Sequence, residues 1–101
     1  MPTLQFEHPI TDYTTWKAAF DRDPIDRRAL GVRSYRIHRP LDRPNYILGE
    51  LDFDTTVQAE ACATALEQLW RSRQAAPALA GAAQVRIVAT VESHQYNDTA
   101  P

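Results

Sequence analysis

The chain has a single cysteine and no long hydrophobic run, and each shortage argues against a class of protein. Its single cysteine, Cys62, cannot form a disulfide within the chain, which argues against a small disulfide-stabilised secreted domain. No apolar stretch is long enough to cross a bilayer, and the first residues lack the basic and then apolar order of a signal peptide. We therefore expect a cytoplasmic protein with no membrane partner.

An excess of charge of one sign is also lacking. Eleven basic and thirteen acidic residues give a net charge of −2, which argues against a nucleic-acid partner. Arginines are nevertheless concentrated between residues 22 and 43, where their guanidinium groups could hold an anionic ligand. Aspartates are interleaved with them, which favours a solvated ion-pair surface over an anion site. The arginines are Arg22, Arg27, Arg28, Arg33, Arg36, Arg39 and Arg43.

The length of 101 residues and an apolar content of 44% are typical of one globular domain. We expect this domain to span residues 1–95 and a polar tail to span residues 96–101.

The first half of the chain predicts a strand, a helix and a second strand. Apolar residues alternate with polar ones over Thr3–Ile10, as in a strand with one buried face. Thr11 and Asp12 are both suitable helix N-caps, and the apolar residues that follow recur every three or four positions up to Phe20. Asp23 and Pro24 predict a break and a fresh helical start that ends at Gly31. A second strand is expected over Val32–Arg39.

The second half predicts a hairpin partner, a long helix and a last strand. The short join before Tyr46–Asp54 indicates an antiparallel hairpin, in which Gly49 marks a bulge, a close backbone approach or an unpacked position. Strong helix formers fill Val57–Arg73, and an Ala-Leu-Ala segment near residue 79 suggests a short turn of helix. The last strand is expected over Gln84–Glu92.

This element order predicts an α+β, ferredoxin-like βαββαβ fold with a four-stranded antiparallel sheet and two helices on one face. The third and fourth strands carry apolar residues of both parities, such as Leu48 and Leu51, or Ile87 and Val88. We therefore expect the second sheet face to pack against another protomer in a homodimer, since burying it would stabilise so small a chain.

Four segments of the chain resemble the dimeric α/β-barrel superfamily, in particular its antibiotic-biosynthesis-monooxygenase-like members and small uncharacterised actinobacterial-type proteins. The resemblance covers nearly the whole chain, but it identifies a fold more than an activity. The segments are Glu7-His8, Asp12-Tyr13-x-x-Trp16-Lys17-x-x-Phe20, Gly31-Val32-Arg33-Ser34-Tyr35-Arg36 and Asp52-Phe53-Asp54-Thr55.

The resemblance implies a pocket between the sheet and the helices, with an aromatic lining that suits a flat, largely apolar small molecule. The alternative is that the same side chains only fill the core. The residues expected to bind a substrate are Phe6, Tyr13, Trp16, Phe20, Tyr35 and Trp70.

His8 is the candidate catalytic residue because it shares the parity of Leu4 and Phe6 at the end of a strand. An imidazole there could take a proton from a phenol or enol, as a cofactor-independent oxygenation or a cyclisation requires. Two functions follow: an enzyme acting on an aromatic or polyketide-like metabolite, or a non-catalytic ligand-binding, accessory or structural dimer. His8 could equally be a hydrogen-bonded structural residue.

No histidine or cysteine spacing indicates a metal site, and the histidine expected of haem-degrading relatives is missing from the second long helix. We therefore expect no cofactor. Cys62 falls on the apolar stripe of that helix and is expected to be a core residue. The strand carboxylates are expected to face solvent, and an acid and base pair among them is the alternative; they are Glu7, Glu50, Asp52 and Glu92.

Overall fold

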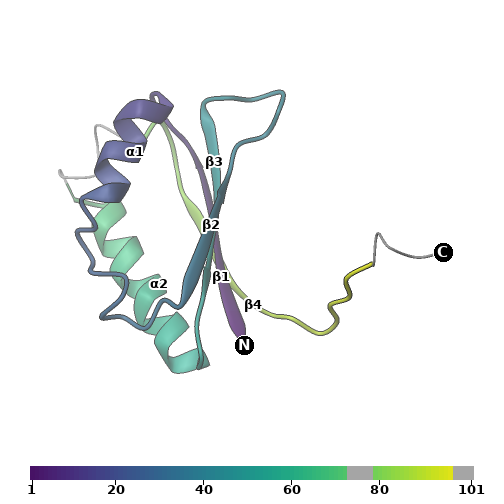
Figure 1. Cartoon of the computed structure of the whole chain (residues 1–101). Helices are drawn as coiled ribbons and strands as arrows, with labels where there is room; N and C mark the ends of the chain where they lie inside the picture. The colour runs from purple at the N-terminus through teal and green to yellow at the C-terminus, as the bar shows by residue number, and fades with distance from the viewer. Residues whose placement is uncertain (73–78, 97–101) are drawn as a thin grey trace.

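The computed structural model describes residues 1–72 and 79–96. The predicted order of strands and long helices is confirmed, with ends that shift by a few residues (Figure 1). The elements are β1 (Pro2–Pro9), α1 (Tyr13–Asp21), β2 (Ser34–His38), β3 (Tyr46–Asp52), α2 (Thr56–Trp70) and β4 (Gln84–Ala89).

The four strands form one antiparallel sheet in the order β2-β3-β1-β4, and both helices lie on the same face of it (Figure 1). This is the predicted ferredoxin-like fold. In residues 1–72 and 79–96, no helix has the length and apolarity needed to span a membrane.

The helical piece predicted from Pro24 to Gly31 is wrong, because the chain makes a series of turns there. Asp23 and Asp26 have φ angles of 51° and 55°, in the left-handed region that a right-handed helix cannot contain. Gly31, predicted as the stop of that helix, has a φ of 99° and lies at the end of the turns instead.

Local hydrogen bonds explain where the two helices begin. The Asp12 carboxylate accepts from the backbone N–H of Thr15 at 2.7 Å, which makes Asp12 the N-cap of α1. Thr55 and Gln58 form a reciprocal capping box at the start of α2. Helix α1 follows one of its two predicted caps, and α2 begins one residue before the predicted Val57.

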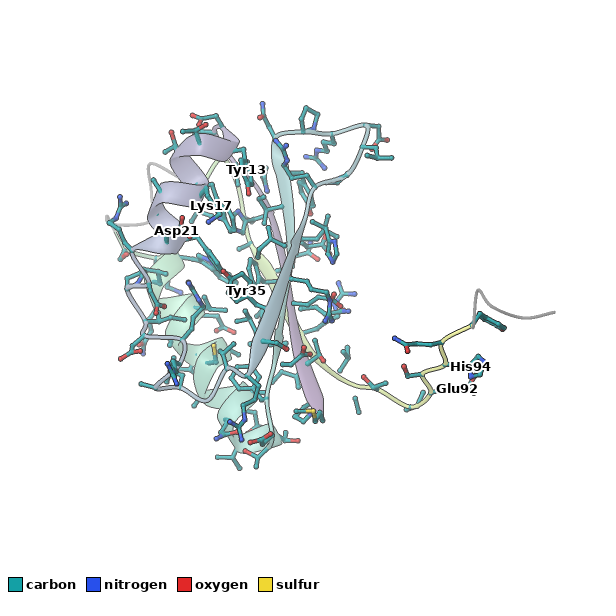
Figure 2. All side chains as sticks on the ribbon, in the orientation of Figure 1. Tyr13, Lys17, Asp21, Tyr35, Glu92 and His94 are labelled. Atoms are coloured by element: carbon teal, nitrogen blue, oxygen red, sulfur yellow. The ribbon has the colours of Figure 1, made fainter. Side chains whose placement is uncertain are left out.

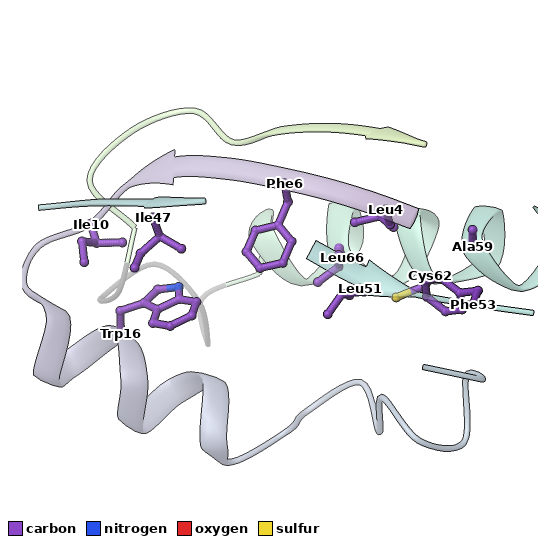
Figure 3. Close-up of a cluster of buried hydrophobic side chains, with 10 residues drawn as sticks. All are labelled: Leu4, Phe6, Ile10, Trp16, Ile47, Leu51, Phe53, Ala59, Cys62 and Leu66. Atoms are coloured by element: carbon purple, nitrogen blue, oxygen red, sulfur yellow. The ribbon is translucent and has the colours of Figure 1, made fainter. Parts of the chain in front are cut away.

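The core lies between the sheet and the helices, and β1 contributes Leu4, Phe6 and His8 to it. Figure 3 shows Phe6 from β1 and Trp16 from α1 pointing into the same space. Phe6 is opposite Gly49 in an uninterrupted register, so Gly49 is not a bulge. A methyl group on Gly49 would overlap the Phe6 ring, and the glycine is therefore a place of close approach.

The other sheet face is mostly polar, although the sequence led us to expect it to be more apolar. Leu48 and Val88 are half-buried there, among ion pairs and hydrogen-bonded side chains. The helices leave this face uncovered (Figure 1). Its polar residues include Thr3, Gln5, Glu7, Ser34, Arg36, His38, Glu50, Asp52 and Arg86.

The chain beyond β4 leaves the body of the domain as an extended segment (Figure 1). Strand β4 ends at Ala89 rather than at Glu92. Leu79 forms an isolated bridge with Ile10, while the rest of the expected Ala-rich turn before it, and most of the polar tail, lie outside the described residues.

Candidate functional site

A cavity of about 70 Å³ lies between the sheet and the helix layer. Strand β1, helix α1, helix α2 and the turns after α1 supply most of its walls, which are largely aromatic and aliphatic. The lining residues with polar or charged side chains are His8, Arg22 and Arg27, together with the indole nitrogens of Trp16 and Trp70.

His8 reaches this cavity from the end of β1 and is only 1% exposed. Its Nδ1 atom lies 3.0 Å from the carbonyl oxygen of Pro9, which can only accept a hydrogen bond, so Nδ1 carries the proton. Burial lowers the pKa of His8 below 6.5, and the bond to Pro9, which acts in the opposite direction, does not offset it. The imidazole is therefore neutral at neutral pH, with its lone pair on Nε2.

The Nε2 atom of His8 has no hydrogen-bond partner among residues 1–72 and 79–96. Every fully buried side-chain nitrogen or oxygen in those residues has a partner, so Nε2, which has none, is not fully buried. Since His8 lines the cavity, Nε2 opens onto it. A neutral imidazole with its basic nitrogen facing a cavity can accept a proton from a bound molecule.

Aromatic rings surround His8 on three sides. The His8 ring stacks on Phe6, with centroids 6.2 Å apart and planes 18° apart. Its centroid lies 6.4 Å from that of Trp16 and 6.0 Å from that of Trp70. Trp16 itself stacks on Phe20 at 4.9 Å. These flat, apolar surfaces suit a planar aromatic ligand.

Five of the residues singled out from the sequence line the cavity, and two do not. Phe6, His8, Trp16, Phe20 and Trp70 are brought together, which follows from their parity and helical spacing. That any of them binds a substrate stays a prediction.

The two tyrosines lie one layer further out. Tyr13 packs on Trp16, with the Arg39 guanidinium 4.4 Å above the Tyr13 ring centroid. Tyr35 contacts the Phe20 ring edge-on at 5.2 Å and is 46% exposed, because β2 is the edge strand. The sequence placed Tyr35 on the correct face, but the strand order leaves it outside the cavity lining.

The sequence reasoning missed Arg27 as a cavity residue. The interleaved aspartates favoured a solvated ion-pair surface for these arginines over an anion site. Two of them do form such pairs: Arg33 with Asp54 at 2.8 Å, and Arg36 with Glu50 at 3.1 Å. Arg27 is different because its side chain is only 15% exposed. Nothing in the sequence pattern separates it from its neighbours, since its placement depends on the turns after α1.

The other candidate groups lie away from the cavity. His38 bonds to Glu50 on the polar sheet face, and Figure 2 shows Glu92 and His94 on the extended segment beyond β4. Burial raises the pKa of Cys62 to about 11, so this thiol stays protonated in the core. Among the described residues, no group of three potential metal ligands comes together.

Glu50 and Asp52 both lie on the polar sheet face, where hydrogen bonds keep them ionised. Burial would raise the pKa of each carboxyl, but Arg36, Gln5 and His38 around Glu50 lower it overall. Hydrogen bonds from Thr3 and Ser34 do the same for Asp52. They therefore serve as charged partners within the sheet and are not directed at the cavity.

The cavity is smaller than a fused-ring ligand. At about 70 Å³ it has roughly half the volume of the engineered cavity of about 150 Å³ that holds benzene. Binding of a polycyclic compound therefore requires side chains at the edge of the cavity to move. Leu69 and Trp70, which are partly exposed on α2, line it and have the room to do so.

No protein-family model matches the sequence, and no curated protein matches it significantly. Solved structures do match. A monooxygenase from the gene ActVA-Orf6 of Streptomyces coelicolor, in complex with nanaomycin D, has a TM-score of 0.67 and 10% identity, over 95% of this chain and 92% of that chain. SnoaB, a cofactor-independent oxygenase from Streptomyces nogalater, has a TM-score of 0.66 and 9% identity, over 91% of this chain and 94% of that chain.

A third match is a Nitrosomonas europaea protein classed with the antibiotic biosynthesis monooxygenases. Its TM-score is 0.59 at 16% identity, over 91% of this chain and 100% of that chain. At these identities the similarity concerns the fold. The chain therefore has the ferredoxin-like fold of antibiotic biosynthesis monooxygenase-like proteins.

Proposed function

We propose that the protein is a cofactor-independent monooxygenase that acts in the cytoplasm on an aromatic or polyketide-like phenol or enol, with His8 as the general base. The observation that carries the proposal is the neutral imidazole whose Nε2 opens onto an aromatic-walled cavity. Phe6, Trp16, Phe20 and Trp70 hold the ring system of the substrate. The shared fold of a cofactor-independent oxygenase supports it.

The chemistry needs only a base, an acidic substrate and dioxygen. His8 Nε2 takes the proton of the phenol or enol, which leaves an electron-rich anion in an apolar cavity. Dioxygen oxidises this anion directly. At a ring methylene the net change is CH₂ + O₂ to C=O + H₂O, so one oxygen atom enters the product and the other leaves as water.

The proposal predicts oxygen uptake with anthrone, a simple aromatic compound whose enol form is acidic. In the presence of a chelator and without flavin, the purified protein is expected to consume one O₂ per anthraquinone formed, and ¹⁸O₂ is expected to label one oxygen of the product. An oxygen electrode and mass spectrometry measure both. Quenching of tryptophan fluorescence by anthrone without any oxygen uptake above the protein-free rate would contradict the proposal and indicate a non-catalytic binding protein.

We also propose that the chain forms a homodimer through the uncovered sheet face. The helices cover one face alone (Figure 1), and the other carries both signs of charge around the half-buried Leu48 and Val88. A face with paired charges can match a second copy of itself across a two-fold axis. Light scattering tests this: twice the mass of the chain is expected, and the mass of one chain would contradict it.

A further inference from the structure

The turns after α1 hold Arg27 in a defined position. Asp23 and Asp26 adopt left-handed backbone conformations, which aspartate tolerates better than most residues. The carboxylate of Asp23 accepts from the backbone N–H of Arg27 at 2.9 Å, and the carbonyl of Arg27 accepts from Val32 at 3.0 Å. The backbone of Arg27 is therefore fixed on both sides.

The Arg27 side chain lies flat on an aromatic column. Its Cζ atom is 3.7 Å from the centroid of the Phe20 ring, which in turn stacks on Trp16 at 4.9 Å. Its Nη1 atom donates to the carbonyl oxygen of Phe20 at 2.8 Å. Arg27 thus extends the aromatic wall of the cavity with a planar cation.

Most of the donors of Arg27 remain available to a ligand. A guanidinium has five N–H donors, and the hydrogen bonds of Arg27 to described residues use Nη1 alone. Asp23 lies 3.4 Å from the same Nη1, a loose ion pair that leaves the other nitrogens open. No buried nitrogen in the described part of the chain lacks a partner, so these donors face open space.

Charge at the cavity is positive. Arg22 and Arg27 both line it, His8 is neutral, and none of the described lining residues is a carboxylate. The charge of Arg27 also acts on the buried Cys62, whose pKa it lowers while burial raises it. Arg27 lines the neighbouring surface groove as well, so it stands between the cavity and solvent.

The geometry points to Arg27 as the residue that selects an aromatic oxyanion for this cavity, by pairing its free donors with the charged oxygen while its plane continues the aromatic wall. This inference rests on the proposed function in one respect. When His8 Nε2 takes the proton of a phenol, the negative charge stays on the ligand oxygen, and Arg27 is the cation that holds it.

Ligand binding can test this without any turnover. Both tryptophans of the chain line the cavity, so quenching of their fluorescence reports occupancy. The probes are 4-nitrophenol, which ionises near neutral pH and whose phenolate absorbs visible light, and 4-nitroanisole, its methyl ether, which cannot ionise. A third probe, 4-nitrobenzoate, carries its charge on a carboxylate that needs no base.

Arg27→Gln is expected to weaken the binding of 4-nitrophenolate by about 10- to 100-fold, the range for a charge-assisted hydrogen bond. Binding of 4-nitroanisole is expected to change by no more than about twofold. The bound nitrophenol is expected to ionise at lower pH than the free compound in the native protein, and this difference is expected to vanish in the variant. The melting temperature of Arg27→Gln checks that the fold survives the loss of the hydrogen bond to the Phe20 carbonyl.

Arg33→Gln is the matched control because Arg33 is exposed, pairs with Asp54 and does not line the cavity. Arg27→Lys serves as a second variant that keeps the charge, and it is expected to retain part of the anion preference. The inference would be overturned if Arg27→Gln weakened the binding of nitrophenolate and nitroanisole equally, or did not weaken the binding of nitrophenolate. Weaker binding of 4-nitrobenzoate as well as of nitrophenolate would support it and show that Arg27 selects a carboxylate as well as a phenolate.

The outcome is separable from that of the proposed function. Anion selection by Arg27 without oxygen uptake would leave the inference standing and contradict the monooxygenase proposal. Oxygen uptake that depends on His8 but is unaffected in Arg27→Gln would support the monooxygenase proposal and contradict the role of Arg27.

Discussion

Replacing His8 by glutamine is expected to lower turnover by about 10²- to 10⁴-fold, the usual contribution of a general base. Glutamine is similar in size to histidine, but its amide cannot accept a proton at neutral pH. Ligand binding is expected to remain, because the aromatic walls are unchanged. Steady-state oxygen uptake and tryptophan fluorescence quenching measure the two effects separately.

His38→Gln is the control for this variant. His38 is 55% exposed and bonds to Glu50 on the opposite sheet face, so its replacement is expected to leave turnover within about twofold of the native value. A His8→Gln protein that melts at the native temperature, binds ligand and still turns over at more than a third of the native rate would show that His8 is not the base.

Gly49→Ala is expected to lower the free energy of unfolding by about 1–3 kcal/mol, as overpacking of a core does. The added methyl group would overlap the Phe6 ring, which is 4% exposed and packs against His8 and Trp70. The ring also lines the cavity, so its displacement is expected to weaken ligand binding as well. Urea denaturation and fluorescence quenching measure the two losses.

A double mutant tests whether the contact with Phe6 causes the loss of stability in Gly49→Ala. Phe6→Leu removes the ring that the methyl group would meet, so the loss in Gly49→Ala, Phe6→Leu is expected to be smaller than the sum of the two single losses. Additive losses would show that the contact between residue 49 and Phe6 is not what requires a glycine.

The strands and long helices were predictable because each carries its own periodicity. The alternation in β1 was enough to place His8 beside Phe6 on the helix side, and the spacing of Trp16 and Phe20 was enough to direct both to the cavity. These are local properties of the chain, and packing did not change them.

The turns after α1 could not be predicted in the same way. Asp23 and Pro24 suit a helix start, yet hydrogen bonds such as that from the N–H of Asp26 to the carbonyl of Asp23 stabilise left-handed conformations instead. The position of Arg27 depends on those turns, so the sequence could not distinguish its guanidinium, which lies on Phe20 in the cavity wall, from those of the neighbouring arginines. Tyr35 lies on the predicted face but outside the cavity lining for a related reason, since strand order decides which strand lies at the edge.

¹⁵N NMR of the histidine side chains can establish whether His8 is a neutral base whose Nε2 faces the cavity. At neutral pH the His8 ring is expected to show a protonated Nδ1 and an unprotonated Nε2, and on acidification to titrate below 6.5, since burial lowers its pKa. A proton on Nε2 at neutral pH, or titration above 6.5, would contradict the account.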